Sequence, residues 1–277
     1  MTALNQARVL ISGGGGGLGR ALCRQLAQSG ARLCISDRRL EAAEQTLSQL
    51  QASGGEGFAV ELDVTREADF SSAIEQMQKR WGGIDILINN AGVASAGTVA
   101  DAPLEQWQAV LDINLLGYVR GCRVAIPALR QSPSAHIVNI ASFAGIANPP
   151  AMASYNAAKA AVISLSESLR FELDPDIAVT VACPAFFQTD LLATSEAQLG
   201  ETAAGAAPQM KAVMNKMMQR APLSADDVAE SILGAVEENR FLVIPHPDAR
   251  QQTWLKRASP EWYFRSVRKS LAAFLKT

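Results

Sequence analysis

The sequence predicts an α/β fold: a doubly wound, parallel seven-stranded sheet with helices on both faces, in a single domain over residues 1–250. Short apolar runs alternate with amphipathic stretches, which is the pattern of parallel strands joined by crossover helices. The run at 84–88 is almost continuously apolar, as expected of a central strand that is covered on both faces. The predicted strands are Val9–Ser12, Arg32–Ser36, Gly57–Glu61, Ile84–Ile88, His136–Ala141, Ala178–Ala182 and Phe241–Ile244, and the predicted helices cover 18–29, 40–52, 67–81, 104–130 and 154–173.

The bulk composition argues against several classes of protein. The chain has 277 residues, 48% of them hydrophobic, and a formal net charge of −2. This length suffices for a full hydrophobic core, and the near-neutral charge argues against nucleic acid as a partner. No charged N-terminal segment precedes an apolar stretch, and no apolar run reaches the roughly 18 residues of a membrane span. We therefore expect a soluble, cytoplasmic protein.

The cysteines and histidines do not suggest a metal centre. The four cysteines lack Cys-x-x-Cys spacing, and Cys34 and Cys183 lie in apolar runs that are typical of core residues. The only two histidines are His136, at the start of a predicted strand, and His246, between two prolines. We expect no metal site and no histidine-based triad.

The first predicted strand runs directly into a glycine-rich turn. Residues Val9–Ser12 are followed by Gly13–Gly19 and then by an amphipathic stretch. A phosphate group binds glycine backbone amides where no Cβ blocks its approach, and the start of the following helix adds a favourable dipole. A flexible linker would lack such patterned flanks, so we interpret the turn as a dinucleotide-binding site.

Tyr155 and Lys159 are four residues apart in a predicted helix. This spacing places both side chains on one face, about 6 Å apart along the axis. An ammonium group beside a phenol favours the phenolate, so we expect Lys159 to lower the pKa of Tyr155 toward neutrality. A tyrosine with such a pKa can act as a general acid and base.

Together with further motifs, these residues resemble the short-chain dehydrogenase/reductase family over roughly residues 7–190. The matching elements are Ser12–Gly19 for the family's Thr-Gly-x-x-x-Gly-x-Gly turn, Asn89–Gly92 for its Asn-Asn-Ala-Gly motif, and Pro184–Thr189 for its Pro-Gly-x-x-x-Thr motif. The chain departs from the pattern at Ser12, which keeps the threonine hydroxyl, and at Ala185, which replaces a glycine.

The resemblance implies a Rossmann fold, a nicotinamide dinucleotide and the catalytic set Asn114, Ser142, Tyr155 and Lys159. In that set the tyrosine exchanges a proton with the substrate, and the lysine assists it and binds the nicotinamide ribose. The serine holds the substrate oxygen, and the asparagine anchors a relay water. The implied cofactor-binding residues are Gly13, Gly17, Leu18, Gly19, Asp37, Arg38, Asp63, Val64, Asn90, Ala91, Gly92, Tyr155, Lys159, Pro184 and Thr189.

The choice of cofactor depends on the end of the second predicted strand. A carboxylate at Asp37 accepts hydrogen bonds from a free adenine-ribose hydroxyl and repels a 2′-phosphate, which favours NAD. NADP is the alternative: if Asp37 turned outward, Arg38 or Arg39 could stack on the adenine or pair with the phosphate.

The favoured function is NAD(P)-dependent interconversion of a secondary alcohol and a ketone, on an apolar small molecule. The alternatives are an NADP-dependent ketoreductase of β-keto acyl or steroid-like ketones and, from a different class, a non-catalytic dinucleotide-binding regulator. The intact catalytic set argues against the regulator, which has no physical need for it.

Two later segments carry less readable patterns. Residues 190–222 lie where a substrate lid would lie, and Met210, Met214, Met217 and Met218 share one helical side there. Residues 251–277 form a basic, aromatic extension, which could contact a membrane surface. We favour packing of this extension on the body of the protein or on a second subunit.

The predicted helices at 104–130 and 154–173 carry alanine and leucine on more than one face. In the family that the chain resembles, these helices pair across a two-fold axis. We therefore expect a homodimer or homotetramer.

Overall fold

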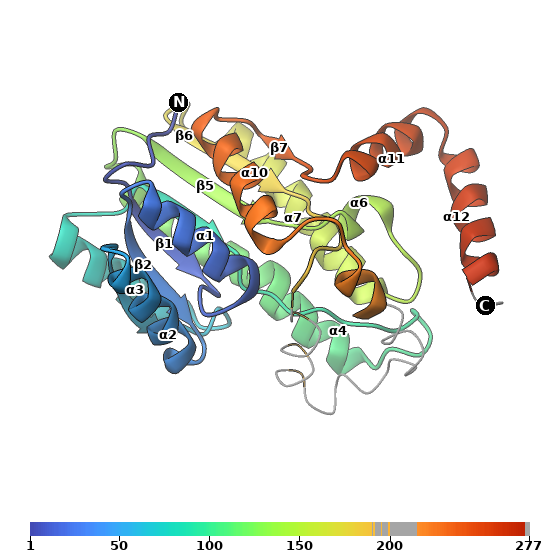
Figure 1. Cartoon of the computed structure of the whole chain (residues 1–277), viewed down its shortest axis with the longest axis horizontal. Helices are drawn as coiled ribbons and strands as arrows, with labels where there is room; N and C mark the ends of the chain where they lie inside the picture. Colours follow the sequence, from blue (N-terminus) through green and yellow to red (C-terminus); the bar gives the residue numbers. More distant parts are fainter. Residues whose placement is uncertain (190, 192–194, 196–198, 200–214, 275–277) are drawn as a thin grey trace.

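The computed structural model describes residues 1–189, 191, 195, 199 and 215–274, and it contains one parallel sheet between two layers of helices (Figure 1). The strands lie in the order β3-β2-β1-β4-β5-β6-β7, and every neighbouring pair is parallel. The predicted doubly wound, seven-stranded sheet is therefore confirmed. The strands are β1 Arg8–Ser12, β2 Arg32–Asp37, β3 Glu56–Glu61, β4 Ile86–Asn89, β5 Ala135–Ile140, β6 Ile177–Ala182 and β7 Leu242–Val243.

Alternate residues of each strand face opposite helical layers. On β1, Val9 and Ile11 pack under α1, α2 and α10, whereas Leu10 packs under α3, α5 and α7. Both faces of the sheet are thus buried, which explains why its strands read as nearly continuous apolar runs. The helices of these layers are α1 Gly17–Gln28, α2 Leu40–Ala52, α3 Glu67–Trp81, α5 Gly117–Leu129, α7 Ala153–Glu172 and α10 Ala225–Glu237.

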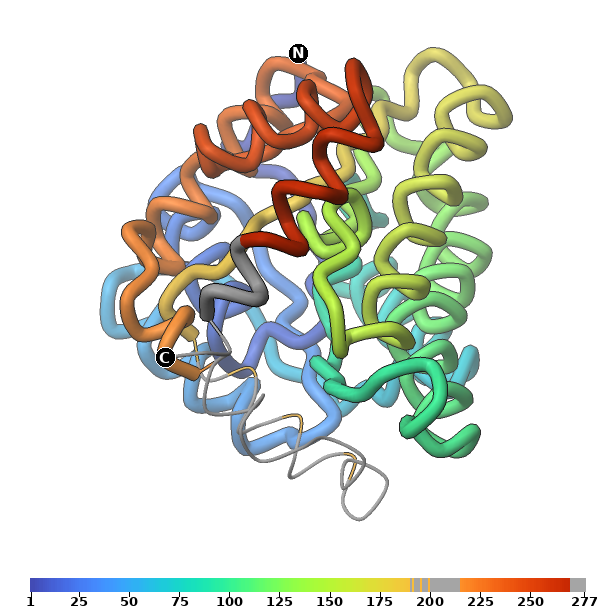
Figure 2. Tube along the Cα trace, turned by 90° about the vertical axis from the view of Figure 1, so that its right-hand side faces the viewer, coloured from blue at the N-terminus to red at the C-terminus, as the bar shows by residue number. Residues whose placement is uncertain are grey.

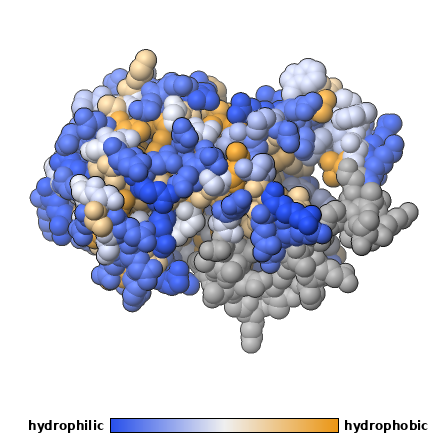
Figure 3. Space-filling view, viewed as in Figure 1, coloured by the Kyte–Doolittle hydropathy of each residue, from blue (hydrophilic) through white to orange (hydrophobic). Residues whose placement is uncertain are grey.

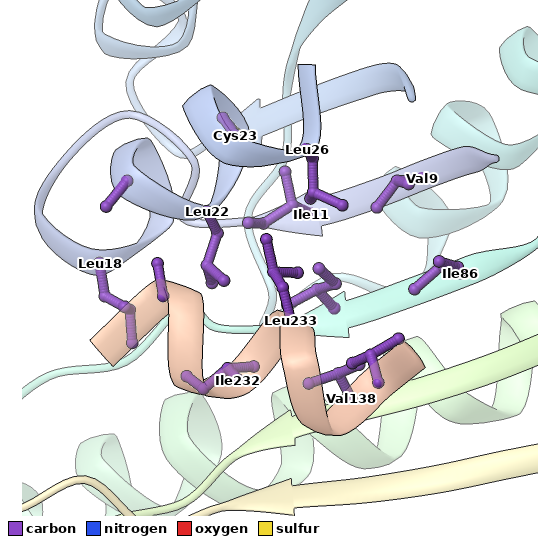
Figure 4. Close-up of a cluster of buried hydrophobic side chains, with 14 of the residues drawn as sticks. Val9, Ile11, Leu18, Leu22, Cys23, Leu26, Ile86, Val138, Ile232 and Leu233 are labelled. Carbon is purple, nitrogen blue, oxygen red and sulfur yellow. The ribbon is translucent and has the colours of Figure 1, made fainter. Parts of the chain in front are cut away.

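Helices α1 and α10 cover the centre of one face. In Figure 4, Leu22 and Leu26 of α1 and Leu233 of α10 lie around Ile11 of β1, and Val9 and Ile232 belong to the same buried cluster. Burying one such side chain stabilises the fold by about 1.5–3 kcal/mol. This cluster therefore holds α1, and with it the glycine turn at its start, firmly on the sheet.

The predicted helix at 104–130 consists of three segments. It begins as α4 (Leu104–Leu111), widens into the π-helical segment η1 (Asp112–Leu116) and continues as α5. The spacing of apolar residues does not reveal a turn that contains one extra residue, so the sequence predicted a single helix. Such π turns occur frequently at functional sites, and η1 contains Asn114.

Among the named helices of the described residues, α6 (Ala144–Ala147), α10, α11 (Pro247–Ala258) and α12 (Pro260–Phe274) were not predicted. Helix α6 is too short to show a periodicity, and charges and aromatic residues interrupt the pattern of α11 and α12. Helix α10 did carry a signal, because Ser224 and Asp227 form a capping box and Val228, Ile232 and Val236 repeat at helical spacing.

Helices α11 and α12 form an arm (residues 247–274) that extends beyond the carboxyl end of β7 (Figure 1). The predicted extension at 251–277 begins inside α11, and its last three residues lie outside the described part of the chain. Most of the predicted lid at 190–222 also lies outside it, including Met210 and Met214. Within the described residues, none of the helices has both the length and the apolar character needed to cross a membrane.

Candidate active site

The glycine turn between β1 and α1 lies at the carboxyl edge of the sheet. Gly13 and Gly17 have φ angles of +66° and +50°, which residues with a Cβ rarely adopt. A Cβ on Gly19 would overlap the carbonyl oxygen of Gly13. The N-cap residue Gly16 offers no side chain to the first turn of α1. The backbone N–H groups of that turn therefore remain able to bind an anionic group.

Asn90, which follows β4, ties the glycine turn to the switch point of the sheet. Its Nδ2 donates to the carbonyl oxygens of Ser12 at 3.0 Å and Gly13 at 2.9 Å. In return, the backbone N–H groups of Asn90 and Ala91 donate to the Oγ of Ser12 at 3.1 and 3.2 Å. Ser12 thus supplies the hydroxyl that threonine supplies in the motif of the family that the chain resembles.

Asp37, the last residue of β2, turns toward the glycine turn. Its Oδ2 accepts a hydrogen bond from the Gly15 N–H at 3.2 Å, and its Oδ1 accepts one from the Arg39 N–H at 3.1 Å. The outward orientation on which the NADP alternative depended is therefore not observed. Arg38 and Arg39 nevertheless line the same cavity.

Tyr155 and Lys159 lie near the start of α7, on the same face, as their spacing predicts. The Nζ of Lys159 lies 5.9 Å from the centre of the Tyr155 ring. This amine donates to the carbonyl oxygen of Ile140 at 2.8 Å and to the hydroxyl of Tyr118 at 3.2 Å. Tyr118 was not predicted as a site residue, since no local pattern reveals a contact across 41 positions of the chain.

Ser142 follows the end of β5 and meets Tyr155 in space. The Ser142 side chain lies close enough to the Tyr155 hydroxyl to lower the pKa of the tyrosine by hydrogen bonding. The Oγ of Ser142 also accepts a hydrogen bond from the Ala144 N–H at 3.1 Å. The serine and tyrosine hydroxyls are therefore placed to hold one substrate oxygen between them.

Burial controls the pKa values of the tyrosine and the lysine. Burial raises the pKa of Tyr155 above its usual value of 10.0, and the hydrogen bond with Ser142 offsets this only in part. Burial also lowers the pKa of Lys159 from 10.5 to about 7. The expectation of a Tyr155 pKa lowered toward neutrality is therefore wrong for the ligand-free protein, because burial outweighs the groups that lower it.

Asn114 lies in the π turn η1 and is fully buried. Its Oδ1 accepts from the Val93 N–H and its Nδ2 donates to the Val93 carbonyl oxygen, both at 2.8 Å. A Cβ on Gly92 would lie 3.0 Å from the Asn114 Oδ1 and 3.5 Å from the Lys159 Nζ. The side-chain amide of Asn114 therefore holds Gly92 and Val93 beside Lys159. Its oxygen and its nitrogen each have a hydrogen-bond partner on Val93.

His246 was set aside in the sequence analysis, yet both of its ring nitrogens hold the loop after β6. The Nδ1 accepts from the Ala185 N–H at 3.2 Å, and the Nε2–H donates to the Phe186 carbonyl oxygen at 3.0 Å. Burial lowers the pKa of His246, which favours the neutral ring that these two bonds require. The histidine thus supports the loop at the position where alanine replaces the family's glycine.

One cavity of about 1580 Å³ connects these groups. It is lined by all of the predicted cofactor-binding residues and by three of the four predicted catalytic residues; Asn114 lies behind Gly92 instead. The predicted residues that line it are Gly13, Gly17, Leu18, Gly19, Asp37, Arg38, Asp63, Val64, Asn90, Ala91, Gly92, Ser142, Tyr155, Lys159, Pro184 and Thr189. Beyond Tyr155 the lining becomes largely apolar. Within the described residues, no cluster of His, Cys, Asp or Glu side chains could hold a metal ion.

Comparisons with known proteins agree with this geometry. A family model described as short chain dehydrogenase matches residues 7–200. The CLA biosynthesis dehydrogenase/reductase of Lactiplantibacillus plantarum is 33% identical over 251 residues, which cover 87% of this chain and 88% of that protein. The 3-alpha-(or 20-beta)-hydroxysteroid dehydrogenase of Mycobacterium bovis is 32% identical over 207 residues, covering 74% and 78%. The crystal structure of a short chain dehydrogenase/reductase from Burkholderia phymatum in complex with NAD superposes with a TM-score of 0.85 and 32% identity, covering 95% of this chain and 96% of that one.

Proposed function

Because this chain belongs to the short chain dehydrogenase family and is an oxidoreductase, we propose that it interconverts a secondary alcohol and a ketone by hydride transfer, with NAD as its cofactor. The observation that carries this proposal is the single cavity in which the glycine turn, Asp37 and Tyr155 meet. Its volume of about 1580 Å³ exceeds the roughly 300–1,000 Å³ of an ordinary ligand pocket. A dinucleotide and a substrate can therefore share it.

The residues present fit a bound dinucleotide. The open first turn of α1 would bind the pyrophosphate, and Asp37 would accept hydrogen bonds from the adenine ribose. Asp63 and Val64 line the cavity and would contact the adenine, and Thr189 lines it near Gly17. Bound NAD supplies the hydride acceptor for alcohol oxidation.

The protein's own groups manage the proton. The hydroxyl of Ser142 orients the substrate oxygen, and the hydroxyl of Tyr155 donates a proton to a ketone or accepts one from an alcohol. Because burial raises the pKa of Tyr155, the neutral phenol predominates at neutral pH. We expect ketone reduction to be supported there and alcohol oxidation to increase toward alkaline pH.

The tyrosine assignment is tested with Tyr155→Phe, which removes the hydroxyl and keeps the ring. We expect turnover to fall by at least about 100-fold, the lower range for general acid–base catalysis, while NAD binding measured by fluorescence stays close to that of the wild type. Turnover within tenfold of the wild type would refute this role.

NAD preference is tested with Asp37→Ala, against Glu41→Ala as the control. Glu41 is an exposed carboxylate in the first turn of α2, and it does not line the cavity. We expect Asp37→Ala to shift the ratio of kcat/KM for NADP and NAD toward NADP by about tenfold or more, and Glu41→Ala to leave it unchanged. An unshifted ratio in Asp37→Ala would count against this residue as the selector and would revive the NADP-dependent ketoreductase.

The substrate class is tested with a panel of alcohols and ketones, followed by the absorbance of the reduced cofactor. We expect activity on apolar secondary alcohols, because the cavity beyond Tyr155 is lined mainly by apolar side chains. Activity on none of the panel, with NAD still bound, would favour the non-catalytic regulator.

A homodimer or homotetramer is part of the proposal. Leu104 of α4, Leu116 of η1 and Phe171 of α7 leave large apolar side chains in solvent, and Phe171 is 88% exposed. We expect these helices to pair with a second copy of the chain. Phe171→Asp should reduce the mass measured by light scattering, whereas Trp254→Asp, a change at an exposed aromatic residue of the arm, should not. An unchanged mass in Phe171→Asp would exclude this face.

We also assign the protein to the cytoplasm. All four cysteines are free and buried, which suits a reducing compartment. Cell fractionation tests this assignment, and recovery with a membrane or secreted fraction would refute it.

A further inference from the structure

The arm formed by α11 and α12 reaches back over the substrate end of the cavity. Its root is His246, whose ring is bonded to the loop at Ala185 and Phe186. The first turn of the arm lines the cavity with Pro247, Asp248 and Ala249, and the rest of the arm does so with Gln252, Leu255, Trp262, Tyr263, Ser266 and Val267. In Figure 2 the red helix α12 runs beside the yellow-green segment that contains α6. The arm therefore lines part of the same cavity as the glycine turn and Tyr155.

Two polar side chains fasten the arm to α6. The Nζ of Lys256 donates to the carbonyl oxygen of Ile146, and the hydroxyl of Tyr263 donates to that of Ala147 at 3.1 Å. These carbonyls end a helix of four residues, where no later turn can supply backbone N–H donors. The Nδ2 of Asn148 also donates to the Ile146 carbonyl oxygen, at 3.3 Å. We call the pair of Lys256 and Tyr263 the latch.

The latch is built into the protein and is not a loose surface contact. Tyr263 is 5% exposed, whereas its neighbours Trp262 and Phe264 are about half exposed. The Lys256 ammonium also lies 5.8 Å from the centre of the Tyr263 ring. Figure 3 shows hydrophobic residues among hydrophilic ones on the surface of the arm. Lys256 and Tyr263 of the arm thus contact the body of the protein, whereas Trp254 and Trp262 are more than half exposed.

Helix α6 connects the latch to the reactive groups. It begins two residues after Ser142, and Ala144 packs in one cluster with Tyr155, Met152 and Met218. A substrate whose oxygen lies between Ser142 and Tyr155 would therefore extend along α6 toward the arm. The lining along this path is apolar, with Phe143, Ala147, Pro149, Pro150, Met152 and Phe186 on the body.

We propose that the latched arm is the outer wall of the substrate site, and that it makes the enzyme select secondary alcohols that carry a long apolar group over short ones. This inference rests on the proposed alcohol oxidation. A short alcohol would contact only the groups around Tyr155, whereas a long one would also bury its far end against Leu255, Trp262 and Val267. The arm would then contribute to binding of the long substrate alone.

The test compares 2-butanol with 2-decanol in the wild type, in the double variant Lys256→Met with Tyr263→Phe, and in Arg257→Met. The double variant keeps the bulk of both side chains and removes the two donors, while Arg257→Met removes a charge from an exposed position of the same helix. We expect the double variant to lose at least about tenfold in kcat/KM for 2-decanol, the effect of a changed apolar pocket. Its values for 2-butanol and its Kd for NAD should stay within about twofold, and Arg257→Met should match the wild type throughout.

A second variant, Trp262→Ala, shortens the wall and leaves the latch intact, and it should show the same selective loss. Equal losses on both alcohols, or no loss on 2-decanol in either variant, would overturn the inference. If the wild type binds NAD but oxidises neither alcohol, the proposed function fails. Direct binding of 2-decanol then tests whether the arm contacts a long apolar molecule. Tryptophan fluorescence should then show that the wild type and Arg257→Met bind 2-decanol, and that the double variant binds it at least about tenfold more weakly. Equal affinities in the three proteins would refute the role of the arm as the outer wall.

Discussion

Replacing Lys159 with methionine should stabilise the protein while it disables the site. Burial lowers the pKa of this amine from 10.5 to about 7, so the folded state disfavours the ammonium that the unfolded chain carries. At about 1.4 kcal/mol per pH unit, this difference corresponds to roughly 5 kcal/mol at pH 7. The two hydrogen bonds that are lost with the amine contribute about 1–3 kcal/mol in the opposite direction.

Removing the amine leaves no buried polar group without a partner. The hydroxyl of Tyr118 also donates to the carbonyl oxygen of Ile140 at 2.9 Å, and this bond remains in Lys159→Met. Methionine has a similar length and fills the space. We therefore expect a net stabilisation of about 2–4 kcal/mol at neutral pH.

The pH dependence identifies the cause. Between pH 7 and 10.5 the unfolded chain binds a proton at Lys159 that the folded protein has released, so the stability of the wild type rises with pH across this window. Below pH 7 both states carry the proton, and the full penalty remains. The advantage of Lys159→Met should therefore be largest at and below pH 7 and should shrink toward pH 10.

Urea unfolding of the cofactor-free protein at pH 7 and pH 10 measures both quantities. Lys79→Met, at an exposed position of α3, is the control for the loss of a lysine and should change the stability by no more than about 0.5 kcal/mol. Destabilisation by Lys159→Met at pH 7, or an advantage that does not depend on pH, would refute the reasoning. The same variant should show little turnover.

Three further outcomes follow from single contacts. Burial lowers the pKa of His136 to about 4, so the wild type should lose about 3 kcal/mol of stability as the pH falls from 6.5 to 4. Urea unfolding should show no such loss in His136→Leu, and the same pH dependence of stability in both proteins would contradict the account. Gly19→Ala places a Cβ on the carbonyl oxygen of Gly13, so titration should find NAD binding weakened by at least about tenfold; wild-type affinity would disprove the close approach. His246→Phe removes both bonds to the loop after β6, so KM for NAD should rise severalfold and His246→Gln should restore part of the loss, whereas equal KM values in all three proteins would rule out a positioning role.

Patterns of neighbouring residues in the sequence predicted the fold and most of the candidate site. The apolar runs predicted all seven strands. The inner strands are buried on both faces and must be apolar at nearly every position, whereas the edge strand β3 is exposed at both ends. The glycine turn and the spacing of Tyr155 and Lys159 were equally readable, since a positive φ, a close backbone approach and a shared helix face are set within a few residues.

Only the tertiary structure decided what depends on distant contacts. Burial set the pKa values of Tyr155 and Lys159, and it reversed the direction expected for the tyrosine. The roles of His246 and of the arm also appeared only in three dimensions, because their partners lie 60 or more residues away. A sequence pattern reports the neighbours along the chain, whereas solvent exclusion and cavity shape arise from the whole packed molecule.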